Sequence, residues 1–335
     1  MTRRPTNHRP GDRTAWRWTI ASLALTGLIL ASLTSGDLPL TPQEVLDALL
    51  GRADDFTTTV VLTWRLPRAL TALAFGAALG AAGAIFQSLT RNPLGSPDVI
   101  GFNTGAYTGV LLTLLLLPAS GFLTLAMASI VGGLVTAVLV LALARHTRSG
   151  VRRGLILTGI AISALLAAVN TWLLYRTDTA TATTGSIWAA GTLDNIRWAQ
   201  AWPALTTLAI IGIATATVLP TLRILALGDD LATALGLRVP RTRTTLAISA
   251  VLLTATTTAV AGPIMFIALA APHIAKTLLP RSRPILAATV SGAILLAAAD
   301  WIAAHAFAPT QLPVGAITVT LGGLYLTLSI LLRRQ

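Results

Sequence analysis

Two arginines, Arg65 and Arg68, bracket a Leu-Pro pair at the start of a long apolar stretch. A guanidinium group binds a carboxylate through paired, charge-assisted hydrogen bonds, so this pair could receive acidic side chains of a second protein. The alternative is that both residues anchor the stretch at a membrane surface, with their charged ends extended into water. On the residues alone, the pair is either a docking site or an interface anchor.

The segment L-G-D-D-L-A-T-A-L-G, residues 227–236, could contact a partner in a different way. Asp229 and Asp230 suit the first turn of a short helix, and Gly236 suits its end. Leu231 and Leu235 then share one face, and such a face can dock in the groove of another protein. Packing of this face against the chain's own helices is the alternative. The candidate residues are Leu227, Gly228, Asp229, Asp230, Leu231, Leu235 and Gly236.

A turn and a helix start follow the first long apolar stretch. Asn92 and Pro93 predict the turn. Ser96 is a preferred N-cap residue, Pro97 a preferred first helical residue, and Asp98 an acid suited to the first turn. We therefore expect these three residues to cap the next membrane helix.

Prolines interrupt a later apolar run, residues 262–279, at two places. Gly262-Pro263 and Pro272-His273 each predict a break, and broken helices often line transport paths. Kinking that serves only packing is the alternative. A lone histidine such as His273 is more typical of a structural hydrogen bond than of a ligand site.

Several kinds of chemistry lack their residues in this sequence. There is no cysteine, and the four histidines are too scattered for a metal site. Neither a phosphate-binding G-x-x-x-x-G-K-[ST] loop nor a G-x-S-x-G nucleophile motif occurs. We therefore expect no metal, no cofactor and no catalysis by this chain, so that any ATP hydrolysis occurs on a partner.

The elements that must position these residues are membrane helices. Of the 335 residues, 54% are hydrophobic and 11% are charged, whereas soluble domains have about 25% charged residues. We predict an all-α, multi-pass membrane protein with about ten transmembrane helices. It would comprise a basic tail, residues 1–17, and one transmembrane domain, residues 18–335, with a long basic-side loop at about 222–243. Ala72, Gly76, Gly80 and Ala84 recur every four residues and predict a close helix–helix contact.

The distribution of charge predicts the orientation. With ten spans and both termini in the cytoplasm, 19 of the 24 lysines and arginines lie on the cytoplasmic side. That excess is what the positive-inside rule requires. The net charge of +12 thus reports topology, and no nucleic-acid partner is expected. A cleaved signal peptide at residues 19–33 is an alternative to the first span.

Five motifs together resemble the permease subunits of iron-siderophore and vitamin B12 ABC importers. They are R-L-P-R (65–68), Q-S-L-T-R-N-P-L-G-S-P-D (87–98), L-G-D-D-L-A-T-A-L-G (227–236), A-G-P-I-M-F-I-A-L-A-A-P-H-I-A-K (261–276) and Q-L-P-V-G-A-I-T-V-T-L-G-G-L-Y-L (311–326). The likeness extends from about Thr19 to the end of the chain. Within the family, the G-type branch that serves ferric enterobactin is the most similar. Gln311, Ala304 and Lys276 depart from residues common in the wider family.

The resemblance implies a bundle like that of the vitamin B12 permease, in a multi-pass chain of the cytoplasmic membrane. It implies a second, different permease subunit, two copies of a cytoplasmic ATPase and an external binding protein or lipoprotein. It assigns residues 228–236 to ATPase coupling, and Arg65 and Arg68 to docking of the binding protein. The expected cargo is a ferric catecholate siderophore, with another siderophore, haem or cobalamin as alternatives. A secondary transporter is disfavoured, because carboxylates are scarce within the apolar stretches.

Overall fold

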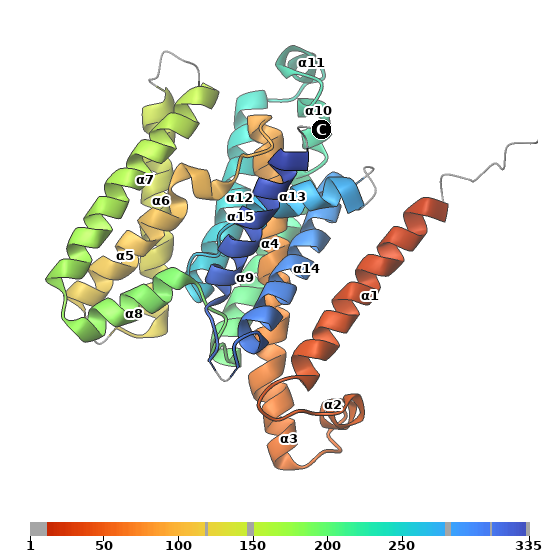
Figure 1. Ribbon diagram of the computed structural model, residues 1–335. Coiled ribbons are helices and arrows are strands. Elements are labelled where there is room, and N and C mark those ends of the chain that lie inside the picture. The colour runs from red at the N-terminus through yellow and green to blue at the C-terminus, as the bar shows by residue number, and fades with distance from the viewer. Residues whose placement is uncertain (1–11, 118–119, 146–150, 279–282, 309, 333–335) are drawn as a thin grey trace, which may run out of the picture.

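The computed structural model describes residues 12–117, 120–145, 151–278, 283–308 and 310–332, and this part of the chain is helical without strands (Figure 1). Residues 1–11 of the predicted tail lie outside the described residues. The described helix α1 already begins at Asp12, ahead of the predicted boundary at residue 18.

The long helices form one bundle with short elements at its two ends. Their bounds are α1 (Asp12–Thr34), α4 (Leu66–Thr90), α5 (Phe102–Leu116), α6 (Phe122–Arg145), α7 (Val151–Arg176), α9 (Trp198–Val218), α12 (Val239–Ala261), α13 (Ile267–Leu278), α14 (Pro284–His305) and α15 (Val314–Leu332). The short elements are α2 (Pro42–Leu49), α3 (Asp55–Thr59), the π-helical turn η1 (Val60–Arg65), the 3-10 turn η2 (Pro97–Ile100), α8 (Thr179–Ala190), α10 (Thr221–Leu225) and α11 (Asp229–Ala234). In Figure 1, α5 to α8 form one side of the bundle and α1 the opposite side.

The centre of the molecule is one long helical unit. α3, η1 and α4 follow one another without a break over 36 residues. At 1.5 Å per residue the unit is about 54 Å long, whereas the hydrocarbon core of a bilayer is about 30 Å thick. Its first part therefore projects beyond the apolar layer, and Figure 1 shows α2 and α3 at the lower end of the bundle.

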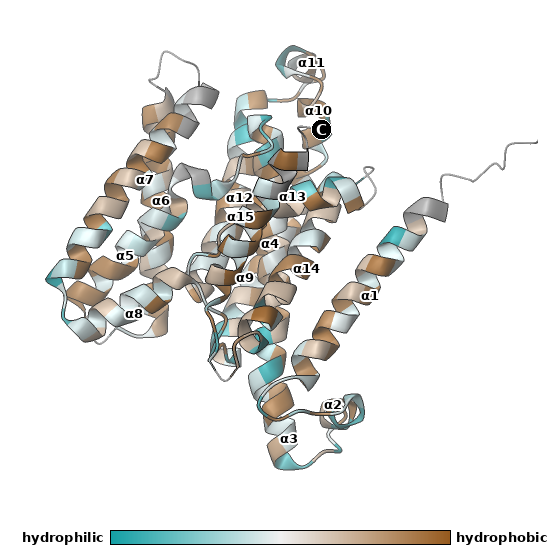
Figure 2. Ribbon diagram, viewed as in Figure 1, coloured by the Kyte–Doolittle hydropathy of each residue, from teal (hydrophilic) through white to brown (hydrophobic). Residues whose placement is uncertain are grey.

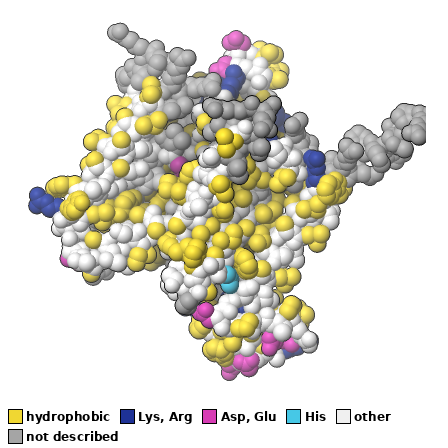
Figure 3. Space-filling model, viewed as in Figure 1, with side chains coloured by type: hydrophobic (Ala, Val, Ile, Leu, Met, Phe, Trp, Pro, Cys, Tyr) yellow, Lys and Arg dark blue, Asp and Glu magenta, His cyan; other side chains and the backbone are white. Residues whose placement is uncertain are grey.

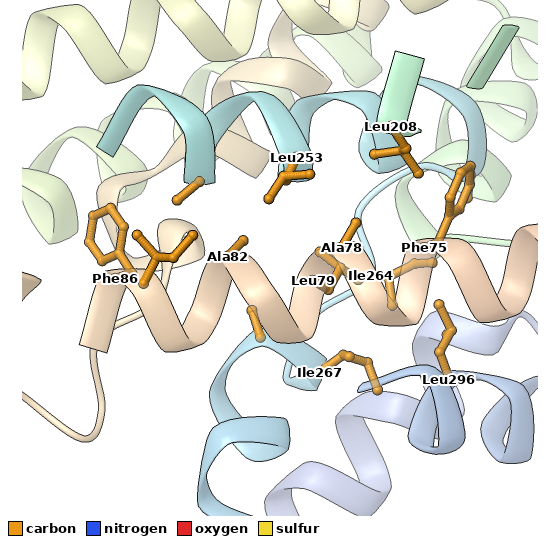
Figure 4. Packing of buried hydrophobic residues seen from close by; sticks show 14 of the residues in the cluster. Phe75, Ala78, Leu79, Ala82, Phe86, Leu208, Leu253, Ile264, Ile267 and Leu296 are labelled. Carbon is orange, nitrogen blue, oxygen red and sulfur yellow. The ribbon is translucent and has the colours of Figure 1, made fainter. Parts of the chain in front are cut away.

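The hydrophobic core surrounds α4. Phe75, Leu79 and Ile85 are fully buried. Their cluster includes Leu253 of α12 and Leu296 of α14, as the close view of Figure 4 shows. A helix that is apolar on all sides and buried in this way belongs inside a bundle, as the sequence predicts for this stretch.

The predicted small-residue stripe on α4 packs directly against α14. A Cβ atom placed on Gly76 would lie 2.3 Å from the carbonyl oxygen of Gly292, and one placed on Gly80 would lie 2.2 Å from that of Ala288. The two backbones thus approach more closely than any larger side chain allows.

The distribution of apolar residues supports a multi-pass membrane protein. Seven described helices are long and apolar enough to span a bilayer, and α5, α13 and the described part of α15 are shorter apolar helices. Brown, hydrophobic residues follow the long helices in Figure 2, while apolar side chains cover the middle of the face shown in Figure 3. The count of about ten spans and the cytoplasmic position of both termini stay predictions.

Three connections contain helical structure. The polar segment after α7 contains a further helix, α8, which Asp178 caps by accepting a hydrogen bond from the Thr181 amide at 3.0 Å. The loop expected over residues 222–243 ends earlier, because α12 begins at Val239. The connection after α1 contains the short helix α2, at whose start the Thr41 amide donates a hydrogen bond to the Glu44 carboxylate at 2.7 Å.

Candidate functional sites

Arg65 links the end of η1 to the connection between α1 and α2. Its guanidinium group donates a 2.7 Å hydrogen bond to the Leu33 carbonyl and another to the Leu38 carbonyl. Because both acceptors are backbone groups of this chain, the contact fixes the α1–α2 connection against the start of α4. Arg65 therefore has a structural role that the sequence did not reveal.

Arg68 forms an ion-pair cluster with two carboxylates of the same chain. Its guanidinium nitrogens lie 2.9 Å from an oxygen of Asp300 and 2.8 Å from one of Asp194. Nη1 also donates to the Gln311 side-chain oxygen at 3.2 Å. The structure thus gives both arginines partners within the chain, which neither the docking nor the anchoring interpretation included.

Sequence reasoning missed Asp300 as the partner of Arg68. Asp300 is buried in α14, and it is the only acidic residue in an otherwise apolar helix. An ionised side chain in an apolar span is costly unless it is paired. The sequence does contain a signal for this pair. Asp300 lies near the end of one apolar stretch and Arg68 near the start of another, so the two could lie at the same depth in the membrane.

A cavity of about 690 Å³ opens around this cluster. Its lining includes Arg65, Arg68 and Asp300 together with aromatic side chains. Trp301 and His305 stack with ring centroids 4.9 Å apart, and the Arg197 guanidinium lies 5.1 Å from the centre of the Trp64 ring. Arginine and aromatic surfaces of this kind suit flat, anionic groups, because such groups can both stack and accept hydrogen bonds.

The predicted partner-binding segment forms a short helix at the opposite end of the bundle, where α11 projects in Figure 1. Gly228 and Gly236 flank it with φ values of +107° and +83°, which favour glycine. Leu227, Leu231 and Leu235 are 57%, 57% and 60% exposed, whereas Ala232 is fully buried. The three leucines are thus exposed in and beside α11, while Ala232 packs on the bundle.

Asp229 holds α11 on the bundle. Its carboxylate accepts two hydrogen bonds from Arg243 of α12, at 2.9 and 2.8 Å. Arg91, which follows α4, lies 3.9 Å from the same carboxylate. Asp229 therefore joins α11 to two central helices, whereas Asp230 is exposed.

The turn after α4 forms as predicted, but its capping role is different. The Asn92 side-chain oxygen accepts a hydrogen bond from the Leu94 amide at 3.0 Å, and Pro93 lies within this turn. Ser96 and Pro97 begin the 3-10 turn η2, and the Ser96 side chain makes no capping hydrogen bond. The membrane helix α5 begins only after Gly101. The expectation that Ser96 caps this helix was therefore wrong, because η2 intervenes.

Asp98 takes part in a polar chain instead. It accepts a 2.7 Å hydrogen bond from the Asn103 amide nitrogen. The Asn103 oxygen in turn accepts one from Thr258 of α12 at 3.2 Å. Desolvation raises the pKa of Asp98 to about 7, although the hydrogen bond from Asn103 acts in the opposite direction. These hydrogen bonds connect η2, α5 and α12 in a mostly apolar bundle.

The predicted double break in the run 262–279 is a single break. Gly262 has a φ of +72° and ends α12, and Pro263 lies in the non-helical connection to α13. Pro272 lies inside α13, which continues through it. The ring of His273 meets that of Tyr325 edge-on at 6.1 Å, so this part of α13 contacts α15.

α4 provides the surroundings in which Pro272 is tolerated. Proline donates no hydrogen bond to the carbonyl four residues before it, here that of Ala268. That carbonyl lies against Gly83, where a Cβ atom would be only 1.7 Å away. The Gln87 side chain donates to the next carbonyl, that of Leu269, at 3.1 Å. The two α4 residues thus give space and a hydrogen bond to the distorted part of α13.

Comparison with known proteins places these features in a family. The FecCD transport family matches residues 24–334. The chain is 47% identical over 314 residues to the ferric enterobactin transport system permease protein FepG of Escherichia coli (strain K12), covering 91% of this chain and 94% of that protein. It is 34% identical over 308 residues to the Fe(3+)-citrate import system permease protein YfmE of Bacillus subtilis (strain 168), covering 91% and 92%.

The fold also has a counterpart among solved structures. One structure, described as an inward-facing conformation of a metal-chelate type ABC transporter, aligns with a TM-score of 0.80. The alignment covers 96% of this chain and 99% of that one, at 24% identity. This similarity concerns the fold.

Proposed function

Because this chain belongs to the FecCD transport family, we propose that it is the permease subunit of an ABC importer that carries a ferric catecholate siderophore across the cytoplasmic membrane. The observation that carries the proposal is the 47% identity to FepG over 91% of the chain. The permease role is common to the relatives described above. The cargo is the finer part of the proposal, because a relative named for ferric citrate is 34% identical.

Growth on single iron sources tests the cargo. A host strain deleted for this chain should lose growth on ferric enterobactin and keep growth on ferric citrate. Restoring the chain on a plasmid should restore uptake of radioactive iron supplied as ferric enterobactin. A strain that loses only growth on ferric citrate would contradict the catecholate assignment and leave the permease role intact.

For the cytoplasmic end, we propose that α11 couples ATP hydrolysis on a partner to transport. The exposure of Leu227, Leu231 and Leu235 supports this role, because three neighbouring leucines in water favour burial in a partner's groove. Asp229 adds a rigid link to α12, through which a displacement of α11 reaches the bundle. Movement of the docked helix would then favour the inward- or outward-open state.

A triple substitution tests the coupling proposal. Replacing Asp229, Asp230 and Leu235 with alanine should abolish uptake while leaving membrane insertion unchanged. Leu46→Ala is a control for the loss of an exposed leucine, because Leu46 is similarly exposed but lies on α2 at the opposite end. Normal uptake by the triple variant would rule out coupling through α11.

For the external end, we propose that a binding protein docks around the cavity at Arg65 and Arg68. Both arginines are engaged within the chain, so their role would be to shape this surface rather than to supply free charges. The remaining partners that we propose are a second, different permease subunit and two copies of a cytoplasmic ATPase. The sparsely buried span on α7, of which 17% is inside the chain's own bundle, leaves room for a neighbouring subunit or lipid.

A further inference from the structure

A second large cavity lies at the end of the bundle that carries α11. It has a volume of about 680 Å³, within the range of small-molecule sites. The end of α4, the end of α9 and the start of α14 form its walls, together with α10. Helix ends from three spans meet here, so the cavity lies at the level where a bilayer changes from acyl chains to headgroups.

The wall of this cavity is largely apolar. Part of its lining consists of leucines: Leu89 of α4, Leu219 after α9 and Leu222 of α10. Ile285 and Leu286 contribute from the first turn of α14, and Leu286 is itself exposed. A site for a fully hydrated ion would not need this much hydrocarbon, whereas the upper part of a lipid would contact it favourably.

Four arginines line the same cavity: Arg91, Arg223, Arg243 and Arg283. Asp229 binds Arg243 directly and lies 3.9 Å from Arg91. Arg223 and Arg283 are exposed, and neither forms an ion pair within the described part of the chain. The four arginines carry four positive charges and Asp229 carries one negative charge, so the cavity has a net positive charge beside its apolar wall.

We propose that this cavity binds the headgroup of an anionic glycerophospholipid from the cytoplasmic leaflet. Arg223 and Arg283 bind the phosphodiester, and the apolar wall receives the glycerol and the first acyl carbons. The inference rests on the orientation in the proposed function, which places this end in the cytoplasm. Basic pockets between membrane helices on that side are suited to anionic headgroups.

The cavity and the neighbouring α11 segment are separate features of this end of the bundle. The exposed leucines of α11 belong to an element that projects beyond the bundle, whereas the cavity lies between the helix ends. Asp229 lies between the two, because it binds cavity-lining Arg243 and begins α11. A bound lipid would therefore hold α10 against α14 and stabilise the base on which α11 stands.

Lipid binding to the purified full-length permease tests the proposal. In detergent, the protein is titrated with phosphatidylglycerol or phosphatidylcholine, and bound lipid is counted by native mass spectrometry. Phosphatidylglycerol should bind more tightly than phosphatidylcholine. The double variant Arg223→Gln, Arg283→Gln should weaken phosphatidylglycerol binding about tenfold or more, since each basic residue contributes about 1 kcal/mol and 1.4 kcal/mol is tenfold.

A matched control removes the same charge outside the cavity. Arg238 and Arg241 are exposed at the start of α12 and do not line the cavity. The double variant Arg238→Gln, Arg241→Gln should bind phosphatidylglycerol like the unaltered chain. A third variant, Ala216→Trp, fills the apolar wall without changing any charge and should also weaken binding.

Three results would overturn the proposal. They are equal affinity for the two lipids, equal loss in both arginine double variants, and displacement of phosphatidylglycerol by inorganic phosphate at similar concentration. None of these measurements uses the siderophore. Failure here therefore leaves the transport proposal standing, and failure of uptake on ferric enterobactin leaves this one standing.

Discussion

Arg68 receives its partners from parts of the chain that are far apart in sequence. Asp300 lies 232 positions away, on α14, and accepts hydrogen bonds from both Nε and Nη2. Asp194 comes from the connection before α9. A partly buried cation between two carboxylates draws three segments together at one end of the bundle, and this explains how an arginine is accommodated at the start of an apolar helix.

Removing Asp300 should destabilise the protein strongly. In the variant Asp300→Ala, Arg68 loses one of its two carboxylate acceptors, and the loss of a charged hydrogen-bond partner costs about 1–3 kcal/mol. The double variant Arg68→Met, Asp300→Leu should recover part of that stability, because it removes the buried carboxylate and leaves only the partly exposed Asp194 without its partner. Thermal unfolding in detergent measures both. Asp230→Ala, at an exposed acid, is the control, and equal midpoints for Asp300→Ala and Asp230→Ala would contradict the buried ion pair.

The sequence predicted the residue types of these sites better than their partners. The start of α11 at Asp229 and its end before Gly236 follow from local preferences, so both were correct. The pairing of Arg68 was missed, because a contact over 232 positions leaves no periodic signal. Ser96 was assigned to the wrong helix, since the same Ser-Pro-Asp pattern suits a single 3-10 turn as well as a span.

At the scale of elements, α4 determines what its neighbours can do. Its glycines allow α14 to approach on one side, and Gly83 with Gln87 accommodates the proline of α13 on the other. The stripe at Gly76 and Gly80 was predictable from its spacing of four. The break at Gly262 was also predicted, but the continuation of α13 through Pro272 was not, because whether a proline stops a helix depends on the neighbour that compensates it.

Adding one methyl group to the α4 stripe should separate α4 from α14. In Gly76→Ala the new Cβ would meet the Gly292 carbonyl at 2.3 Å, and overpacking of this kind costs about 1–3 kcal/mol. Gly212→Ala on α9 is the control, because no atom lies within 4 Å of its Cβ position. That substitution should be neutral or stabilise the helix by up to about 1 kcal/mol. The thermal midpoint of each variant gives the comparison, and an unchanged midpoint in Gly76→Ala would show that the helices can yield.

At the scale of the whole molecule, the two ends of the bundle differ in charge: one end is acidic and the other is basic. α2 and α3 lie at one end, within a connection that contains five acids and one arginine between residues 36 and 63. α10 and α11 lie at the other end, beside the arginine-lined cavity. From the positive-inside rule we predict that the second end faces the cytoplasm. The helices alone do not predict the orientation in the membrane, because an apolar bundle fits the bilayer in either orientation. The charges of the loops favour one of the two.

Thiol labelling from one side of the membrane tests that direction on a clean background, because the chain has no cysteine. Gln43→Cys places a thiol on exposed α2, and Ala234→Cys places one on exposed α11. A membrane-impermeant maleimide should modify only the first variant in intact spheroplasts and only the second in inverted vesicles. Solubilised protein should react at both positions, which controls for burial. Labelling of both variants from the same side would contradict the orientation predicted from charge. It would also contradict the cytoplasmic placement of α11 and of the lipid cavity.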